Sequence, residues 1–179
     1  MIFRAARSAG MTRAYRFSRD RSGSTIVEFA LIALPFLALI FAILQTALIF
    51  FSSQVLDSGL QDAARLIRTG QAQQQQFSAN QFKQAVCDEI LGLLNCEDGL
   101  IIDVRTWDNF RDADVGVPIT NGEIDNNFIF DPGGRGDIVV VRAFYEWPIV
   151  LPTMNADVAI LKNGKFLISS AATFRNEPF

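Results

Sequence analysis

One carboxylate in this sequence stands where its charge is costly. Glu28 comes one position before a run, Phe29 to Phe51, that contains no charged side chain and only two hydrogen-bonding ones, Gln45 and Thr46. A carboxylate at such a boundary needs a partner, and a free amine on a neighbouring chain would serve. The alternative is that Glu28 extends to the polar headgroups beside an ordinary membrane anchor.

The two cysteines, Cys87 and Cys96, are the other residues whose pairing would matter. Nine residues of straight helix would separate their Cα atoms by roughly 13 Å, beyond the ~7 Å limit for a disulfide. A bridge therefore requires a helix that ends near Leu93 to Asn95 and a chain that folds back. Free thiols are the alternative. Two cysteines without any histidine supply too few soft ligands for a metal site.

Catalytic patterns are missing from the sequence. The chain contains no histidine, which excludes histidine-based triads, HExxH zinc sites and histidine general bases. Residues 133–136 (GGRG) lack the spacing of a phosphate-binding loop. The carboxylate pairs Asp88-Glu89 and Glu97-Asp98 are typical of a solvated surface. We therefore expect no enzyme, no catalytic or cofactor-binding residue, and no small-molecule substrate.

The element that must position Glu28 is a membrane-spanning helix. At ~1.5 Å per residue, the apolar run is long enough to cross a hydrocarbon core about 30 Å thick. The backbone must be helical there, and Pro35 is tolerated with an expected kink. The run is longer than the core of a cleaved secretory signal, and no A-x-A pattern follows it, so the sequence predicts an anchor.

Charge predicts the orientation of this anchor. Six arginines precede it and the next basic residue after it is Arg65, so the positive-inside rule places the N-terminus in the cytoplasm and both cysteines in an oxidising compartment. From Ser24 onward ten basic and eighteen acidic residues leave a net charge near −8. That balance argues against nucleic acid as a partner. The leader arginines are Arg4, Arg7, Arg13, Arg16, Arg19 and Arg21.

Beyond the membrane the helix is expected to continue as an amphipathic stem. Leu56, Leu60, Ala63 and Ile67 share one helical face, which predicts a helix to about Thr69, with Gly70 as its stop. A polar tract, residues 71–76 (QAQQQQ), is interpreted as a linker.

The remaining residues predict an α+β domain. Ser78-x-x-Gln81 is a capping-box pattern before a helix from about Ala79 to Leu93. Three strands follow, joined in one roughly three-stranded antiparallel sheet with the helix packed on it: Leu100 to Trp107, half-buried by its alternation, Asp137 to Trp147, and Lys165 to Phe174. The predicted parts are a leader (1–23), a transmembrane helix and stem (24–70), a Gln-rich linker (71–78) and this domain (79–179).

The long segment from Asp108 to Gly136 separates the first two strands. With Asp137 at its edge it carries seven acids, and so long a connection is usually functional or mobile. A calcium site is one hypothesis for it, although the EF-hand pattern is absent and exposed acids are common in loops. Residues 128–130 (FIF) are expected to pack on the sheet or on a partner.

The residues around Glu28 resemble a known processing site. Residues 23–30 (GSTIVEFA), after a basic leader, resemble the processing site of type IV pilin-like precursors. In that class a membrane peptidase cuts after the glycine and leaves a glutamate at the fifth mature position. The resemblance implies cleavage between Gly23 and Ser24, with Glu28 as that glutamate, paired with the free α-amine of a neighbouring subunit.

A narrower resemblance is to the TadE-like proteins, minor pilin-like components of tight-adherence (Tad) pilus systems. It is carried by residues 27–41 (VEFALIALPFLALIF), Val139 to Pro152, and Ser169 to Phe179, with the cysteine pair. It implies a structural subunit for pilus assembly and adhesion, held in the bacterial inner membrane by a single span with its domain in the periplasm. Its partners would be a prepilin peptidase, other minor pilins and the Tad assembly platform.

The resemblance leaves open whether the protein enters the fibre or stays at its base. A second hypothesis is an uncleaved, membrane-anchored periplasmic binding or envelope module that uses its acidic loop on a ligand. That hypothesis leaves Gly23, Ser24 and Glu28 unexplained.

Overall fold

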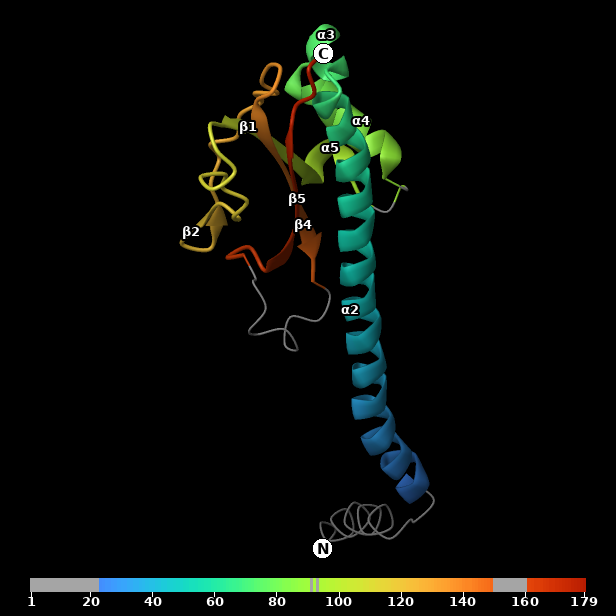
Figure 1. Cartoon of the computed structure of the whole chain (residues 1–179). Coiled ribbons are helices and arrows are strands. Elements are labelled where there is room, and N and C mark those ends of the chain that lie inside the picture. The colour runs from blue at the N-terminus through green and yellow to red at the C-terminus, as the bar shows by residue number, and fades with distance from the viewer. Residues whose placement is uncertain (1–22, 91, 93, 150–160) are drawn as a thin grey trace, which may run out of the picture. The chain divides into compact units, whose positions relative to one another are not determined.

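The computed structural model describes residues 23–90, 92, 94–149 and 161–179, which form a long helix followed by an α+β domain (Figure 1). Two compact units meet inside the helix, between Ile43 and Leu44. The elements are α2 (Ser24–Arg68), α3 (Gln71–Gln74), α4 (Ala79–Glu89), α5 (Cys96–Gly99), β1 (Leu100–Trp107), β2 (Ile119–Thr120), β3 (Glu123–Ile124), β4 (Ile138–Pro148) and β5 (Lys165–Arg175).

Helix α2 is continuous over 45 residues and passes through Pro35. It ends as predicted, because Gly70 adopts the left-handed conformation (φ 81°) that terminates helices and that glycine favours. The tract interpreted as a linker contains the short helix α3.

A three-stranded antiparallel sheet in the order β1-β4-β5 forms the centre of the domain, which confirms the predicted α+β fold class. Leu100 of β1 pairs with Tyr145 of β4, and Trp107 pairs with Ile138. Strand β5 pairs along the other side of β4, from Ile138 with Arg175 to Pro148 with Lys165. Strands β2 and β3 form a separate two-stranded ribbon.

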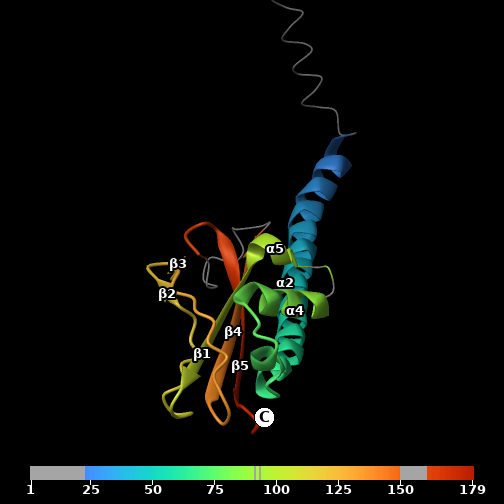
Figure 2. The same ribbon diagram turned by 90° about the horizontal axis from the view of Figure 1, so that it is seen from above.

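The main core lies between one face of this sheet and the helices. The part of α2 after Leu44 and helix α4 lie on one side of the sheet, and the segment carrying β2 and β3 lies on the other (Figures 1 and 2). The apolar face predicted for the stem is buried: its two leucines, its alanine and its isoleucine all lie in this core. The buried helix residues are Leu56, Leu60, Ala63, Ala64, Ile67, Phe82 and Val86.

Helix α4 begins and ends for reasons that are local. Ser78 and Gln81 form the predicted capping box. The helix is shorter than predicted: it ends at Glu89, with Ile90 already extended, and the expected end at Leu93 lies outside the described residues. This early end lets the chain return, so Cys87 and Cys96 form the predicted disulfide with a Cα–Cα distance of 5.8 Å.

The second face of the sheet is covered more fully than the sequence predicted. β1 was expected to be buried on one side only, yet Asp103 on its other side is fully buried. The segment between β1 and β4 covers this face with a small apolar cluster, in which Phe128 lies 6.1 Å from Phe144, centroid to centroid. The predicted packing of residues 128–130 is thus confirmed for Phe128, on the sheet, and for Phe130, which joins the main core and contacts Phe82 of α4. Ile129 between them is 44% exposed.

Candidate functional site: the start of the anchor and an ionic clamp on the sheet

The predicted processing residues lie at the beginning of α2. Ser24 is the first residue of this helix and Gly23 directly precedes it. Gly23 is exposed, and a Cβ placed on it would meet no atom within 4 Å. No positive φ requires a glycine there either. The described fold therefore has no packing or conformational need for glycine at position 23.

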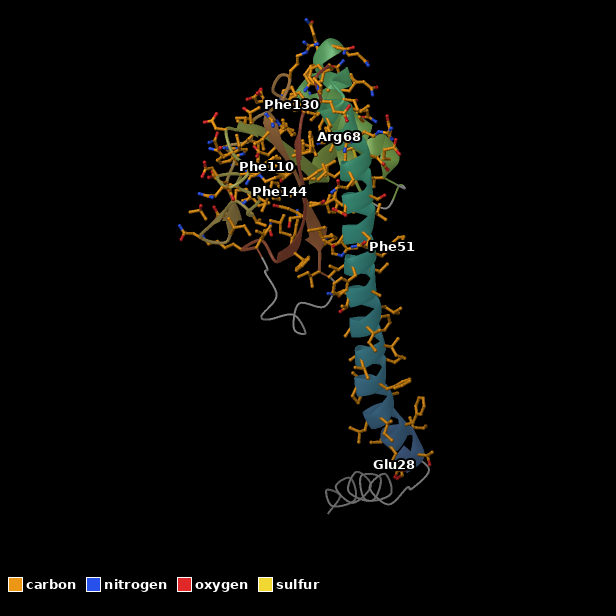
Figure 3. The ribbon with its side chains drawn as sticks, in the orientation of Figure 1. Glu28, Phe51, Arg68, Phe110, Phe130 and Phe144 are labelled. Atoms are coloured by element: carbon orange, nitrogen blue, oxygen red, sulfur yellow. A yellow bond between two sulfur atoms is a disulfide. The ribbon has the colours of Figure 1, made fainter. Side chains whose placement is uncertain are left out.

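Glu28 is exposed on the first turns of the same helix, where Figure 3 labels it. Its Oε1 accepts a hydrogen bond of 2.9 Å from the Ser24 hydroxyl, four residues earlier. No ion pair involves this carboxylate within the described residues. Its charge is thus available to a cationic partner at the surface of the helix.

The helix surface after Glu28 is apolar and mostly exposed. Large side chains from Ile26, 71% exposed, to Phe51, 54% exposed, lie at the surface of the described structure, and Ile40 and Ile49 are half-buried. Among the described helices, only α2 is long and apolar enough to cross a membrane. So large an exposed apolar surface indicates a lipid or protein environment.

The change from exposed to buried follows one face of the helix. Gln45 and Ile49 on this face are half-buried. Ser52 continues the face and is fully buried, and Leu56 and Leu60 follow it into the core. The apolar anchor therefore passes directly into the stem that carries the domain, without an intervening loop.

A second group of polar residues is buried in the sheet, and we call it the ionic clamp: Asp103 of β1, Arg142 of β4 and Arg105 of β1. The Asp103 carboxylate accepts bonds from Nη2 of Arg142 at 2.7 Å and from Nε of Arg105 at 3.0 Å. It also accepts the backbone N–H of Ile129 at 3.0 Å. The register that pairs Asp103 with Arg142 across the two strands makes this contact possible.

The clamp ties the long segment between β1 and β4 to the sheet. Arg142 Nη1 donates to the Gly116 carbonyl at 2.9 Å and contacts the Asp114 carboxylate at 3.3 Å. Arg105 donates to the Asn127 carbonyl. Each arginine thus reaches from the buried aspartate to the backbone of the covering segment, and together they hold it at both Gly116 and Asn127.

Electrostatics keep Asp103 charged. Burial raises the pKa of this carboxyl, but the hydrogen bonds from Arg105, the Ile129 amide and Arg142 together hold its pKa below the ordinary value of 3.8. The clamp therefore holds a charged carboxylate inside the folded protein.

Sequence reasoning assigned no role to the clamp residues. The available signal was Arg142, a charged residue in the middle of the apolar stretch 138–144 (IVVVRAF), which in a central strand needs a buried counter-charge. The acids of the covering segment do not converge: no group of three or more metal-ligating side chains occurs in the part of the chain that the structure describes. Asp114 and Asp131 instead accept hydrogen bonds from Arg142 and Thr106.

Comparison with known proteins gives one match. The sequence model of the family described as TadE-like protein matches residues 23–65, which run from the predicted processing glycine through the apolar helix to the stem. No curated protein and no solved structure matches this chain. The anchor and stem of this chain, residues 23–65, therefore carry the signature of the TadE-like proteins, as the sequence resemblance predicted.

Proposed function

We propose that this chain is a pilin-like structural subunit for assembly of a Tad pilus. The observation that carries the proposal is the TadE-like match over residues 23–65, because it covers Gly23, Ser24, Glu28 and the apolar helix together. α2 holds the subunit in the bacterial inner membrane, with the arginine leader in the cytoplasm and the α+β domain in the periplasm.

We further propose that a prepilin-type peptidase cuts between Gly23 and Ser24. Support comes from the environment of Gly23, where the fold itself has no use for a glycine. Since neither packing nor backbone conformation explains a glycine at this exposed position, recognition by an enzyme that reads the chain is a role it can serve. Cleavage would also free the Ser24 α-amine at the membrane boundary.

Glu28 then acts between subunits. Its carboxylate is exposed and has no ion pair within the described chain, and it lies one turn from the new N-terminus. The freed α-amine of a neighbouring subunit would neutralise it, and the apolar helices would align in that register. The domain contacts other minor pilins and the assembly platform. The proposed role is structural and includes no catalysis.

The test is N-terminal sequencing of the membrane-extracted protein from its native host, with and without the prepilin peptidase. The expected result is a mature chain that starts at Ser24 and is lost in the peptidase-deficient strain. Gly23→Ala, which the fold should accept without loss of stability, is expected to block cleavage in the same way. Because the wild type and Gly23→Ala are both expected to fold, a block in the variant would report loss of recognition by the peptidase and not a folding defect.

A chain that keeps its arginine leader in both strains would contradict the processed-pilin proposal. The working function would then be the uncleaved, membrane-anchored envelope module, with the domain as its binding part.

A further inference from the structure

The two outer edges of the sheet differ in their backbone hydrogen bonding. At the β1 edge, Val104 donates its N–H to the Ile129 carbonyl at 2.9 Å, and its own carbonyl accepts the N–H of Asp131 at 2.9 Å. The segment around Phe130 thus pairs with β1 as a short parallel extension. At the β5 edge, from Phe166 to Phe174, the described chain provides no backbone partner on the side away from β4.

A groove runs beside this open edge. It has a volume of about 280 Å³ and lies between the last turns of α2, at Gln61, Arg65 and Arg68, and residues 171–174 of β5. The strand contributes small side chains here (Ala171, Ala172 and Thr173), so another backbone can approach closely. Its volume is near the lower end of small-molecule pockets, about 300–1,000 Å³, so the unpaired edge of β5, not the volume, favours an extended chain as its occupant.

The groove is basic in a domain that is otherwise acidic. The exposed Arg65 side chain forms no hydrogen bond or ion pair within the described residues. Arg68, one turn later, contacts Glu177 at 3.3 Å, but both side chains are about half exposed, so this pair is weak. The two guanidinium groups therefore favour a partner that carries carboxylates.

We propose that the β5 edge and this groove bind an extended acidic segment of another protein, which adds to the sheet as a fourth strand. Backbone hydrogen bonds to β5 provide affinity. Carboxylates on alternate residues of the segment, about 7 Å apart along a strand, would face Arg65 and Arg68 and set its register. The proposal does not depend on cleavage after Gly23.

A second copy of this chain fits the groove poorly. Pairing of β5 with β5 of a copy would bring the arginines of both grooves to one interface, where like charges repel. Residues 169–173 of β5 (SSAAT), in which exposed and buried side chains alternate, contain no acid that could offset them. Opposite charge thus favours a different protein as the occupant.

The test is site-specific photo-crosslinking with the full chain in native host membranes. A photoreactive phenylalanine replaces Thr173 at the groove or, as the matched control, the exposed Thr120 of β2. The expected result is an adduct at position 173 only, mapped by mass spectrometry to an acidic, extended segment of a different protein. Arg65→Glu together with Arg68→Glu should lower its yield roughly fivefold or more, and the two lysine replacements should retain it.

Three results would overturn the proposal: no adduct at position 173, an adduct only with a second copy of this chain, or a yield that does not respond to charge reversal. Arg65→Glu alone serves as the folding control, because that side chain forms no hydrogen bond or ion pair within the described residues. It should leave the melting temperature unchanged while lowering the adduct.

Discussion

At the scale of single residues, Asp103 is the side chain on which the second face of the sheet depends. It is fully buried, and four donors converge on it from Arg105, Arg142 and the Ile129 amide. A buried ion pair of this kind is worth little compared with apolar residues of the same shape. Removing the aspartate alone is costly, since the arginine that remains is buried without a counter-charge.

Asp103→Asn is therefore expected to destabilise the domain by about 3–5 kcal/mol, because Arg142 would stay buried without its carboxylate. The measurement is thermal or denaturant unfolding of the full chain in detergent. Asp125→Asn is the matched control: Asp125 is an exposed acid of the same covering segment, and its removal should change stability by less than about 0.5 kcal/mol. Equal effects of the two substitutions would show that the clamp does not hold the domain.

The same residue predicts a pH dependence. Since the folded state holds the pKa of Asp103 below 3.8, its contribution to stability is fully present above that ordinary value. As the pH falls through the lower, folded pKa, the contribution is lost. The difference in unfolding midpoint between the wild type and Asp103→Asn should stay constant from pH 7 to 5 and narrow below pH 4. A difference that persists unchanged to pH 2 would argue against a charge-dependent clamp.

At the scale of elements, the end of α2 is joined to the last residues of the chain. The Glu177 N–H donates to the Arg68 carbonyl at 2.9 Å and so satisfies one of the open carbonyls at the helix end. The Asn176 amide donates to the carbonyls of Pro132 and Gly134, at 3.0 and 2.9 Å. Figure 1 shows this end of the chain beside α3. The stem thus ends in a junction of the helix, the tail and the covering segment.

Gly70 is the residue of this junction on which the Phe179 ring packs. It needs the left-handed conformation, and a Cβ placed there would lie 2.1 Å from Cγ of Phe179. Gly70→Ala is expected to destabilise the domain by about 1–3 kcal/mol more than Gly164→Ala, whose φ is also left-handed (+77°) but whose Cβ would meet nothing within 4 Å. Melting temperatures of the two variants give the comparison. Equal losses would mean that the Phe179 ring does not pack on Gly70 in solution.

At the scale of the whole molecule, the two parts of the chain suit different environments, one apolar and one aqueous. The helix from Ile26 to Phe51 exposes apolar side chains that a bilayer would accept, while the stem after it and the domain share one buried core. Ser52 is the first fully buried residue of the helix. A subunit built in this way can stay anchored by its helix and present a folded domain outside the bilayer.

The proposed orientation makes a direct prediction. Alkaline phosphatase fused after Phe179 should be active, because this enzyme needs the oxidising side of the membrane, and β-galactosidase at the same position should be inactive. Replacing all six leader arginines by glutamine is expected to lower phosphatase activity, and replacing them by lysine should preserve it. An inactive phosphatase fusion on the otherwise unchanged chain would contradict the orientation.

The features that could be predicted from the sequence are those that depend on near neighbours along the chain. Apolar length and helical periodicity predicted the anchor and stem, Ser78 with Gln81 predicted the start of α4, and β1 was predicted at its observed bounds. Each of these signals is local, since a hydrophobic period, a helix cap or a turn depends on residues that are close together in the sequence.

What lies across the second face of the sheet depends on contacts between residues that are far apart in the chain. Asp103 and Arg142 are 39 residues apart in the chain, and strand register places them opposite each other. The covering segment has little regular structure, so no period marks it as packed, and its acids alone suggested a metal site as readily as an ion network. The open β5 edge and the basic groove beside it likewise depend on strand order and helix placement, which are properties of the assembled fold.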